Sequence, residues 1–328
     1  MSATADRDHA SHADRLGIGL AAVGRPAYIN AGRADDLRDG RSVDAMRART
    51  ADVLDAAYAG GIRYVDVARS YGYAEGFLRD WMDDHPEITD LTVGSKWGYR
   101  YVGDWRMDAA VHEVKDHSLA AFTRQLAETR ALLGNRLDVY HIHSVTPDTG
   151  VFENADLLAA LADLRDDGVA VGLSVSGVSQ ADSIRRAVEI SIGGVPLFTS
   201  VQATWNPLEP SAGAALAQAA QSGARVIVKE ALANGRLVPG QQAGDPDAAR
   251  VSRVADAVGV SVDRLALAAA LAQPWAWRVL SGAVSPAQVH ENLAAAEVSV
   301  SAAVLAELRD AAEPPARYWS QRSGRAWG

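Results

Sequence analysis

Apolar runs of strand length alternate with helix-period segments along almost the whole chain, and no other feature limits its fold so strongly. This alternation is typical of parallel strands joined by helical crossovers, and eight such pairs predict a single closed (β/α)8 TIM barrel of the α/β class. The expected strands are residues 16–22, 64–68, 91–96, 137–144, 171–176, 197–204, 225–229 and 278–282. The expected helices are residues 44–59, 74–84, 118–133, 154–167, 180–190, 212–222, 246–272 in two pieces, and 286–296.

The chain is long enough for one large core, because it has 328 residues of which 48% are hydrophobic. A single barrel of this length is ordinary, and no linker-like stretch divides the sequence. Residues 16–328 are therefore expected to form one barrel domain that includes the C-terminal tail. Residues 1–15 are polar and mixed in charge, and we expect them to form a flexible N-terminal arm.

Composition excludes several classes of function. Cysteine is absent, so disulfides, thiolate metal sites and a cysteine nucleophile are excluded. The net charge of -9 argues against nucleic acid as a partner. No stretch is long and apolar enough for a secretory signal or a membrane span, so a cytoplasmic protein without a membrane partner is expected. The oligomeric state stays open.

Four polar side chains lie at or just beyond the C-terminal ends of three successive expected strands: Asp66, Tyr71, Lys96 and His143. In a parallel barrel such strand ends meet at one face, which is the catalytic face. A tyrosine beside a lysine, with a carboxylate to hold the lysine and a histidine to orient a carbonyl, is a device for general-acid catalysis. The chain is therefore predicted to be an enzyme.

Each of these residues has a defined chemical use. A tyrosine with a pKa of about 10 holds its proton at neutral pH, and Lys96 would stabilise the phenolate that forms when the proton leaves. Asp66 would keep that lysine charged. A neutral His143 can donate a hydrogen bond to a substrate carbonyl and so orient it. Taken singly, each residue has an ordinary structural explanation; together, on neighbouring strands, they indicate catalysis.

The segments around these residues resemble the signature of the aldo-keto reductase superfamily. In the family's order they are Gly60-Gly-Ile-Arg-Tyr-Val-Asp66-Val-Ala-Arg-Ser-Tyr71-Gly with Glu75, Val93-Gly-Ser-Lys96, Asp138-Val-Tyr-His-Ile-His143, Gly172-Leu-Ser174 and Val201-Gln202. The similarity runs from about Leu16 to Leu293. It implies a barrel that passes hydride between a nicotinamide cofactor and a small carbonyl or alcohol substrate, with no metal.

The resemblance also decides between two tyrosines in one loop. Tyr71 keeps the family's spacing of five residues from Asp66, whereas Tyr73 lies two residues further on. Tyr71 is therefore the expected proton donor.

A metal centre is the competing interpretation of the histidines. His141 lies two residues before His143 on one strand, so it should face the barrel interior one layer lower, where a structural histidine is expected. Asp66, His141, His143 and Glu230 are all acceptable ligands for zinc or manganese. The interpretation is disfavoured because Lys96 would place an ammonium beside the cation.

At the nicotinamide end, the resemblance implies that Ser174 and Gln202 hold the carboxamide. Two departures from the family pattern stand out. Val175 stands where many members have an asparagine after the serine. Lys229-Glu-Ala-Leu232 stands where many members have a four-residue motif that begins with an aromatic residue. Near the mouth of the barrel, Lys229 is expected to contact a cofactor phosphate or a substrate hydroxyl, or to form an ion pair with Glu230.

At the adenosine end, the segment from Ser281 to Asn292 resembles the family's phosphate-binding segment. Its expected cofactor-binding residues are Gly282, Ala283, Gln288 and Asn292. A helix that starts near Ser285 would offer free backbone N–H groups to phosphate. Basic residues common in NADP-preferring members are missing at Gly282, Val284 and Gln288, and Arg278 or His290 could supply a substitute charge. The expected cofactor is NADPH, with NADH a close alternative.

Two segments are too long to be plain connectors, namely residues 97–116 and the tail after Glu313. With the segment after the sixth strand they place aromatic rings at the expected barrel mouth, and Trp97, Trp105 and Trp205 are predicted to bind substrate. The alternative is that these rings only pin the loops onto the barrel. His112 and His117 are expected to lie in a solvated polar loop.

The predicted function is NAD(P)H-dependent reduction of an aldehyde or ketone, or oxidation of the matching alcohol or sugar, with Tyr71 as general acid or base. Two alternatives stay open. One is a regulatory subunit that only binds a cofactor. The other is a lyase or aldolase that forms a Schiff base with Lys229 or Lys96.

Overall fold

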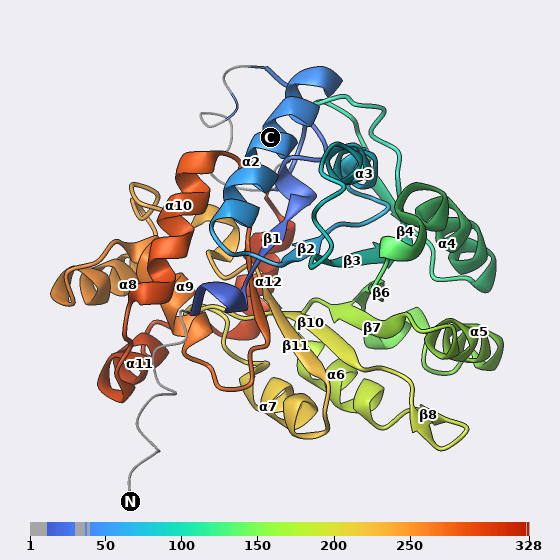
Figure 1. Cartoon of the computed structure of the whole chain (residues 1–328). Coiled ribbons are helices and arrows are strands. Elements are labelled where there is room, and N and C mark those ends of the chain that lie inside the picture. Colours follow the sequence, from blue (N-terminus) through green and yellow to red (C-terminus); the bar gives the residue numbers. More distant parts are fainter. Residues whose placement is uncertain (1–11, 30–36, 38–39, 326, 328) are drawn as a thin grey trace, which may run out of the picture.

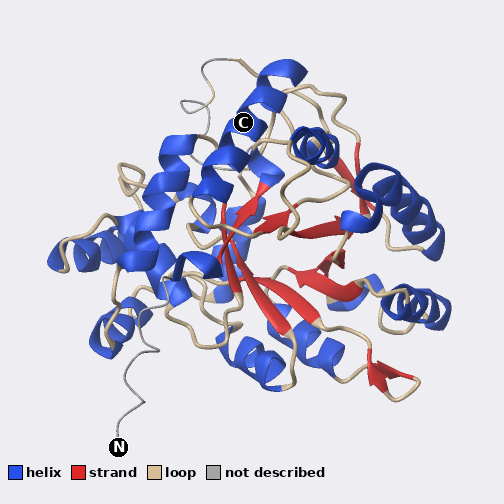
Figure 2. Ribbon diagram, viewed as in Figure 1, coloured by secondary structure: helices blue, strands red, loops and turns tan. Residues whose placement is uncertain are grey.

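A closed barrel of eight parallel strands forms the centre of the computed structural model, which describes residues 12–29, 37, 40–325 and 327. The strands follow the order β1-β12-β11-β10-β7-β6-β3-β2 around the barrel, and helices enclose them (Figures 1 and 2). The barrel strands are β1 (Leu16–Gly19), β2 (Tyr64–Asp66), β3 (Thr92–Trp97), β6 (Val139–Val145), β7 (Ala170–Val175), β10 (Ser200–Thr204), β11 (Arg225–Lys229) and β12 (Arg278–Ser281). The predicted (β/α)8 barrel is confirmed.

Each expected strand corresponds to one barrel strand, although the ends differ. The strand expected at 16–22 stops at Gly19, because Leu20–Ala22 turns into a short 3-10 helix. The register aligns successive strands, with Asp66 beside Gly94 and Lys96 beside His141. The C-terminal strand ends therefore meet at one face of the barrel.

The expected helices are all present. They are α2 (Val43–Ala59), α3 (Ala74–Asp84), α4 (Leu119–Leu133), α5 (Ala155–Asp166), α6 (Gln180–Val188), α7 (Gly213–Gln221), α8 (Pro246–Ala257), α9 (Val262–Leu271) and α10 (Pro286–Ala294). Their boundaries follow local chemistry: α4, for example, begins where the Ser118 hydroxyl accepts a hydrogen bond from the Ala121 N–H, and it ends at Gly134, whose φ is +57°. No helix among the described residues is long and apolar enough to cross a membrane.

The two long segments contain regular structure that the sequence pattern did not predict. A hairpin of β4 (Tyr99–Tyr101) and β5 (Glu113–Lys115) lies within residues 97–116, and the tail after Glu313 holds the helix α12 (Pro315–Ser323). Outside these segments, the helix α11 (Ala302–Arg309) and a short hairpin of β8 (Ser191–Ile192) and β9 (Val195–Pro196) were not predicted either. The expected N-terminal arm lies outside the described residues up to residue 11, and His12–Arg15 forms a 3-10 helix.

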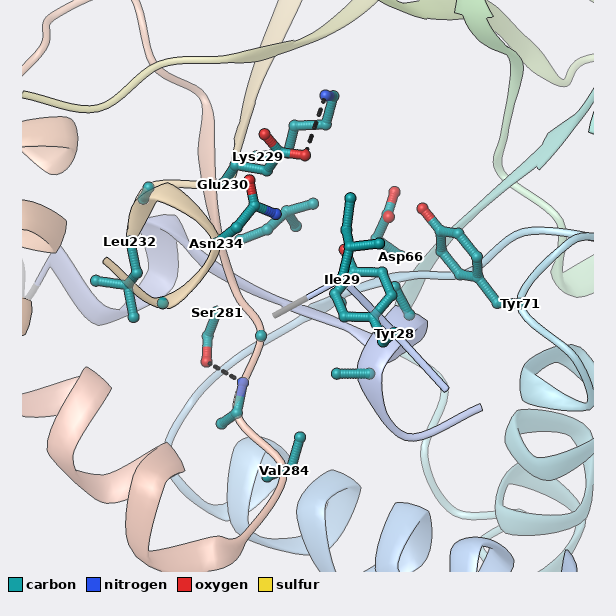
Figure 3. A pocket seen from close by; sticks show the side chains of 18 of the residues that line it. Tyr28, Ile29, Asp66, Tyr71, Lys229, Glu230, Leu232, Asn234, Ser281 and Val284 are labelled. Carbon is teal, nitrogen blue, oxygen red and sulfur yellow. Dashed lines mark hydrogen bonds and ion pairs between the residues drawn. The ribbon is translucent and has the colours of Figure 1, made fainter. Parts of the chain in front are cut away.

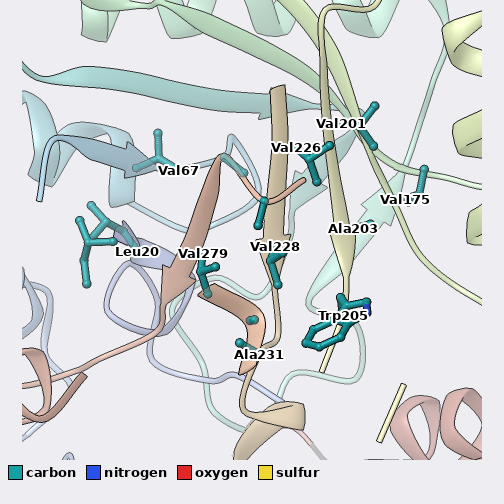
Figure 4. Packing of buried hydrophobic residues seen from close by; sticks show 14 of the residues in the cluster. Leu20, Val67, Val175, Val201, Ala203, Trp205, Val226, Val228, Ala231 and Val279 are labelled. Atoms are coloured by element: carbon teal, nitrogen blue, oxygen red, sulfur yellow. The ribbon is translucent and has the colours of Figure 1, made fainter. Parts of the chain in front are cut away.

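The barrel interior is filled by a large tyrosine between small residues. A Cβ at Gly94 would lie 2.3 Å from the Tyr64 hydroxyl, and one at Gly17 would lie 2.9 Å from the same ring. The two glycines thus leave the room that the ring occupies. Outside the interior, apolar side chains of β10, β11 and β12 form part of the continuous core (Figure 4). Since Asp66 is two residues after Tyr64, it points inward one layer nearer the C-terminal face.

Candidate active site

A cavity of about 610 Å³ opens at the C-terminal ends of the strands. This volume is within the range of roughly 300–1,000 Å³ that is typical of ligand pockets. Its lining runs from Asp66 and Tyr71 to Ser281 and Val284, as Figure 3 shows, and α12 also contributes to it. The cavity thus joins the predicted catalytic residues to the predicted adenosine end.

Three of the four predicted catalytic side chains are in direct contact. The Lys96 ammonium, which is completely buried, lies 2.5 Å from Asp66 Oδ2, 2.9 Å from the Val67 carbonyl oxygen and 3.3 Å from Tyr71 Oη. A buried charge is stable only when it is paired and hydrogen-bonded, and these contacts meet that condition. The lysine is therefore held as a cation beside the tyrosine hydroxyl.

Of the two tyrosines in this loop, Tyr71 lies in the cavity wall and Tyr73 lies outside it. Burial, followed by the charge of Asp66, raises the pKa of Tyr71 well above its usual value, so the phenol keeps its proton at neutral pH. The Tyr73 side chain is half exposed, and its ring stacks on Trp105 with centroids 4.9 Å apart. Of these two tyrosines, Tyr71 lines the cavity and Tyr73 does not.

His143 lines the cavity beside the tyrosine. Its ring meets the Tyr71 ring edge to face, with centroids 5.5 Å apart, and its Nδ1 lies 3.4 Å from the Ser70 hydroxyl. Burial, together with the nearby charges of Lys96 and Lys229, lowers the pKa of His143 well below its usual value. The imidazole is therefore neutral at physiological pH and can offer one N–H to an acceptor in the cavity.

Arg25 belongs to this site although the sequence reasoning missed it. The side chain is almost fully buried, lines the cavity, and donates hydrogen bonds to the Ser70 carbonyl (2.9 Å) and to Glu113 (2.6 Å). Its guanidinium carbon lies 5.2 Å from the centroid of the Tyr71 ring, and its charge acts to lower the pKa of that phenol. The sequence does contain one indication of this role, because Arg25 closely follows the C-terminal end of the first expected strand.

The last helix closes one side of the cavity. Arg322 on α12 forms an ion pair with Glu230, and Arg325 donates a hydrogen bond of 2.8 Å to the Asn234 carbonyl. Beyond the helix, Trp327 lies against Arg25, with 4.7 Å from the guanidinium carbon to the ring centroid. We call these contacts of Arg322, Arg325 and Trp327 with the barrel the tail clasp.

The residues predicted to hold the nicotinamide carboxamide have different surroundings. Gln202 lines the cavity and donates a hydrogen bond of 2.7 Å to Asp66. Ser174 does not line it; its hydroxyl instead accepts a hydrogen bond of 2.8 Å from the Ser144 N–H. Ser144 lines the cavity with a left-handed φ of +53°, so Ser174 supports a residue of the wall.

Lys229 lies in the cavity wall as expected. Its ammonium is 2.9 Å from the Thr204 hydroxyl and 3.8 Å from Glu230. Burial lowers its pKa to about 8, while the charge of Glu230 opposes that shift. The residue thus belongs to a polar cluster that also contains Arg322.

The predicted adenosine-end residues all line the cavity: Gly282, Ala283, Gln288 and Asn292. Asn292 Nδ2 donates to Ser281 Oγ (2.7 Å), and Ser285 caps the start of α10. Among the described residues, two buried acceptor atoms of the lining have no hydrogen-bond partner, namely Asn234 Oδ1 and Asp263 Oδ1. Unpaired polar atoms, a capped helix start and a cavity of this size fit a dinucleotide with hydroxyl and amino donors.

The three predicted substrate-binding tryptophans do not line the cavity, and this expectation is corrected. Trp97 follows Lys96 on β3, so it points away from the barrel interior and packs on Phe122. Trp105 donates to the Arg41 carbonyl, and Trp205 packs against Trp275. The rings fix loops and helices to the barrel, and the aromatic residues that do line the cavity are Tyr28, Tyr71, Tyr99 and Trp327.

The two loop histidines are not solvated, which corrects a second expectation. His117 Nε2 lies 2.8 Å from the His143 carbonyl, and burial lowers its pKa to about 4. His112 is buried and stacks on Trp327 with centroids 4.5 Å apart. His141 lies in the interior, 2.9 Å from the Ser200 hydroxyl. In the described part of the chain, no group of three or more His, Cys, Asp or Glu side chains could hold a metal.

Comparison with known proteins gives one consistent family. The model of the Aldo/keto reductase family matches residues 16–313. An aldo-keto reductase of Strobilurus tenacellus is 23% identical over 325 residues, which cover 90% of this chain and 87% of that protein.

Two solved structures share the fold. The holo form of an aldo-keto reductase from Bacillus halodurans has a TM-score of 0.68 at 20% identity, with 91% of this chain and 92% of that one covered. The aldo/keto reductase from Klebsiella pneumoniae in complex with NADP and acetate has a TM-score of 0.61 at 20% identity, with 90% of each chain covered.

Proposed function

The chain belongs to the aldo/keto reductase family, and we propose that it is an NAD(P)H-dependent oxidoreductase that reduces an aldehyde or ketone, or oxidises the matching alcohol or sugar. The observation that carries this proposal is the contact of 3.3 Å between Tyr71 Oη and the ammonium of Lys96 at the cavity wall. A protonated phenol beside a fixed cation is a general acid.

The proton comes from Tyr71. As charge develops on the carbonyl oxygen of a substrate, the phenol gives up its proton to that oxygen, and Lys96 stabilises the phenolate that forms. Asp66 keeps the ammonium charged and aimed. In the oxidation direction the same phenolate would accept the proton of the alcohol.

Orientation of the substrate falls to the neutral imidazole. His143 would donate a hydrogen bond to the carbonyl oxygen, which polarises the carbonyl and fixes the face that it presents. When bound, a reduced nicotinamide supplies the hydride to the carbonyl carbon. Gln202 and Ser144 are the polar groups of the wall that would hold the carboxamide, with Ser174 behind Ser144.

The family resemblance puts NADPH first and NADH second as the cofactor. The catalytic residues do not distinguish the two, because the two cofactors differ only by the phosphate on the adenosine ribose. The preference between NADPH and NADH must therefore depend on the residues at the adenosine end, which are Gly282 to Asn292 and their neighbours.

A panel of aldehydes, ketones and sugars, each assayed with both cofactors at the absorbance of reduced nicotinamide, tests the proposal. Tyr71→Phe should lower turnover at least about a hundredfold, the lower end of general-acid contributions, while cofactor binding survives. Tyr73→Phe is the matched control and should keep wild-type turnover, because its ring lies outside the cavity.

Three other results would contradict the proposed oxidoreductase function. Equal turnover in Tyr71→Phe and wild type would refute the role of the phenol. Cofactor binding without turnover on any substrate would favour the regulatory-subunit alternative. A borohydride-trapped adduct in place of hydride transfer would favour the Schiff-base alternative.

A further inference from the structure

A carboxylate borders the adenosine end of the cavity. Asp263, in the first turn of α9, lines the same cavity as Val284, Gln288 and Asn292. The helices α9 and α10 pack together, and an ion pair between Arg264 and Glu291 joins them at this end of the cavity. Asp263 and Asn292 thus border the cavity from two adjacent helices.

In the described part of the chain, no side chain forms an ion pair with this carboxylate. Its Oδ1 is buried without a hydrogen-bond partner among the same residues. A buried carboxylate oxygen without a hydrogen bond is unfavourable, because it has lost the hydrogen bonds of water. A ligand with hydroxyl or amino donors would supply them.

Among the described residues, the cations that line the cavity have partners away from its adenosine end. Arg25 is paired with Glu113 and Arg322 with Glu230, both at the catalytic end. Arg325 donates to the Asn234 carbonyl as part of the tail clasp. Lys229 belongs to the polar cluster around Glu230.

Neither substitute cation suggested by the sequence reaches the adenosine end. Arg278 is the first residue of β12, at the strand end opposite Ser281, where its guanidinium lies over Trp277. His290 does not line the cavity. Position 284 carries a buried valine, whose backbone N–H donates to Gln288 Oε1 (2.9 Å). Among the described residues, Arg49 on α2 is a cation near this end, because its Nη1 lies 3.4 Å from the Val284 carbonyl oxygen.

We propose that this cavity selects NADH over NADPH and that Asp263 is the residue that makes the selection. The ribose hydroxyls and the adenine amino group of NADH can donate to its carboxylate. The ribose phosphate of NADPH carries nearly two negative charges and would meet this carboxylate, while the basic residues of NADP-preferring members are missing at Gly282, Val284 and Gln288. This inference rests on the proposed function and reverses the order of cofactors expected from the resemblance.

A purely structural role for Asp263 makes a different prediction. An acidic residue in the first turn stabilises a helix through its dipole, and Asp263 is placed for that. If that were its whole role, neutralising it would lower the melting temperature and leave the ratio of the two cofactor affinities unchanged.

The test is a titration of NADH and NADPH against the protein, followed by tryptophan fluorescence and repeated by calorimetry. We expect wild type to bind NADH at least about tenfold more tightly, since one charge-assisted hydrogen bond is worth about 10- to 100-fold in affinity. Asp263→Asn should shrink that ratio at least about fivefold, with Asp263→Ser as a second variant should the first fold poorly. Asp256→Asn, on the exposed face of α8, is the matched control and should change neither affinity.

The remaining outcomes all speak against Asp263 as the selector. Tighter binding of NADPH by wild type would overturn the inference, and if Arg49→Met then removed that preference, Arg49 would be the clamp. An unchanged affinity ratio in a folded Asp263→Asn would also overturn it. Binding of neither cofactor would instead refute the proposed function, so the two failures are distinguishable.

Discussion

Arg25→Met should slow turnover without weakening cofactor binding, because Arg25 acts on the charge that develops on Tyr71. The guanidinium carbon of Arg25 lies 5.2 Å from the centroid of the Tyr71 ring. For a phenolate charge spread over that ring and its oxygen, Coulomb's law at this separation and an effective dielectric constant of about 20 gives a stabilisation of about 3 kcal/mol. If the proton is about half transferred in the transition state, about 1.5 kcal/mol of this stabilisation lowers the activation free energy, which corresponds to roughly a tenfold change in rate.

Glu113 adds to the effect of this substitution. It is the ion-pair partner of Arg25 at 2.6 Å, and its charge raises the pKa of Tyr71. Without the arginine, this carboxylate faces the phenol uncompensated, so the loss in Arg25→Met should reach about ten- to fiftyfold. Neutralising both partners in Arg25→Met with Glu113→Gln should recover most of that loss.

The assay is kcat at saturating substrate and cofactor for wild type, Arg25→Met, Arg25→Lys, Glu113→Gln and the double variant, with melting temperatures and cofactor affinities alongside. Arg25→Lys keeps the charge and should lose less than Arg25→Met. The reasoning is refuted if Arg25→Met turns over like wild type. It is also refuted if the double variant is as slow as the single one, because the arginine would then act through packing.

Three further predictions test the surroundings of the site. Lys229→Met should keep measurable hydride transfer with an altered KM, and any pH dependence of wild-type KM with an apparent pKa near 8 should vanish in it; a covalent adduct trapped on Lys229, with complete loss of activity in the variant, would contradict this. Trp205→Ala should lower the free energy of unfolding by about 3–5 kcal/mol and leave KM unchanged, since the ring packs away from the cavity; a raised KM in a variant that melts normally would return this tryptophan to the substrate site. Burial lowers the pKa of His141 to about 3, so below about pH 6.5 the unfolded chain takes up a proton that the folded chain refuses, and stability falls as pH falls. His141→Gln should flatten that acid decline in denaturant titrations, and an equally steep decline would show that other groups cause it.

The barrel, and the meeting of Asp66, Tyr71 and Lys96 at its C-terminal face, could be predicted because their signals are local. Strand and helix periods repeat within short windows, and a side chain at the end of a parallel strand faces one known end of the barrel. The same logic would have corrected one error. Trp97 directly follows Lys96 on one strand, and consecutive residues of a strand point to opposite faces, so the two cannot both point into the barrel.

Contacts between distant segments were beyond sequence reasoning. Arg25 gains its place from Glu113, 88 residues away, and Arg322 meets Glu230 across 92 residues. The hydrophobic periodicity of the sequence does not predict such pairs, because each charged residue resembles an ordinary surface residue in its own segment. The unpredicted helix α12 belongs to the same class, since its position depends on the loop that it contacts.

The tail clasp has a consequence for the backbone beneath it. Three non-glycine residues of the loop after β11 have left-handed conformations, with φ of +57° at Glu230, +49° at Ala233 and +54° at Asn234. Such conformations cost of order 1–3 kcal/mol each and persist only where the surroundings hold them. Two of the three are held by arginines of the tail clasp. Loosening α12 would therefore let the loop relax toward ordinary backbone angles, so the wall of the cavity and the last helix should open together as one cooperative unit, and their amide hydrogens should exchange with solvent at a common rate.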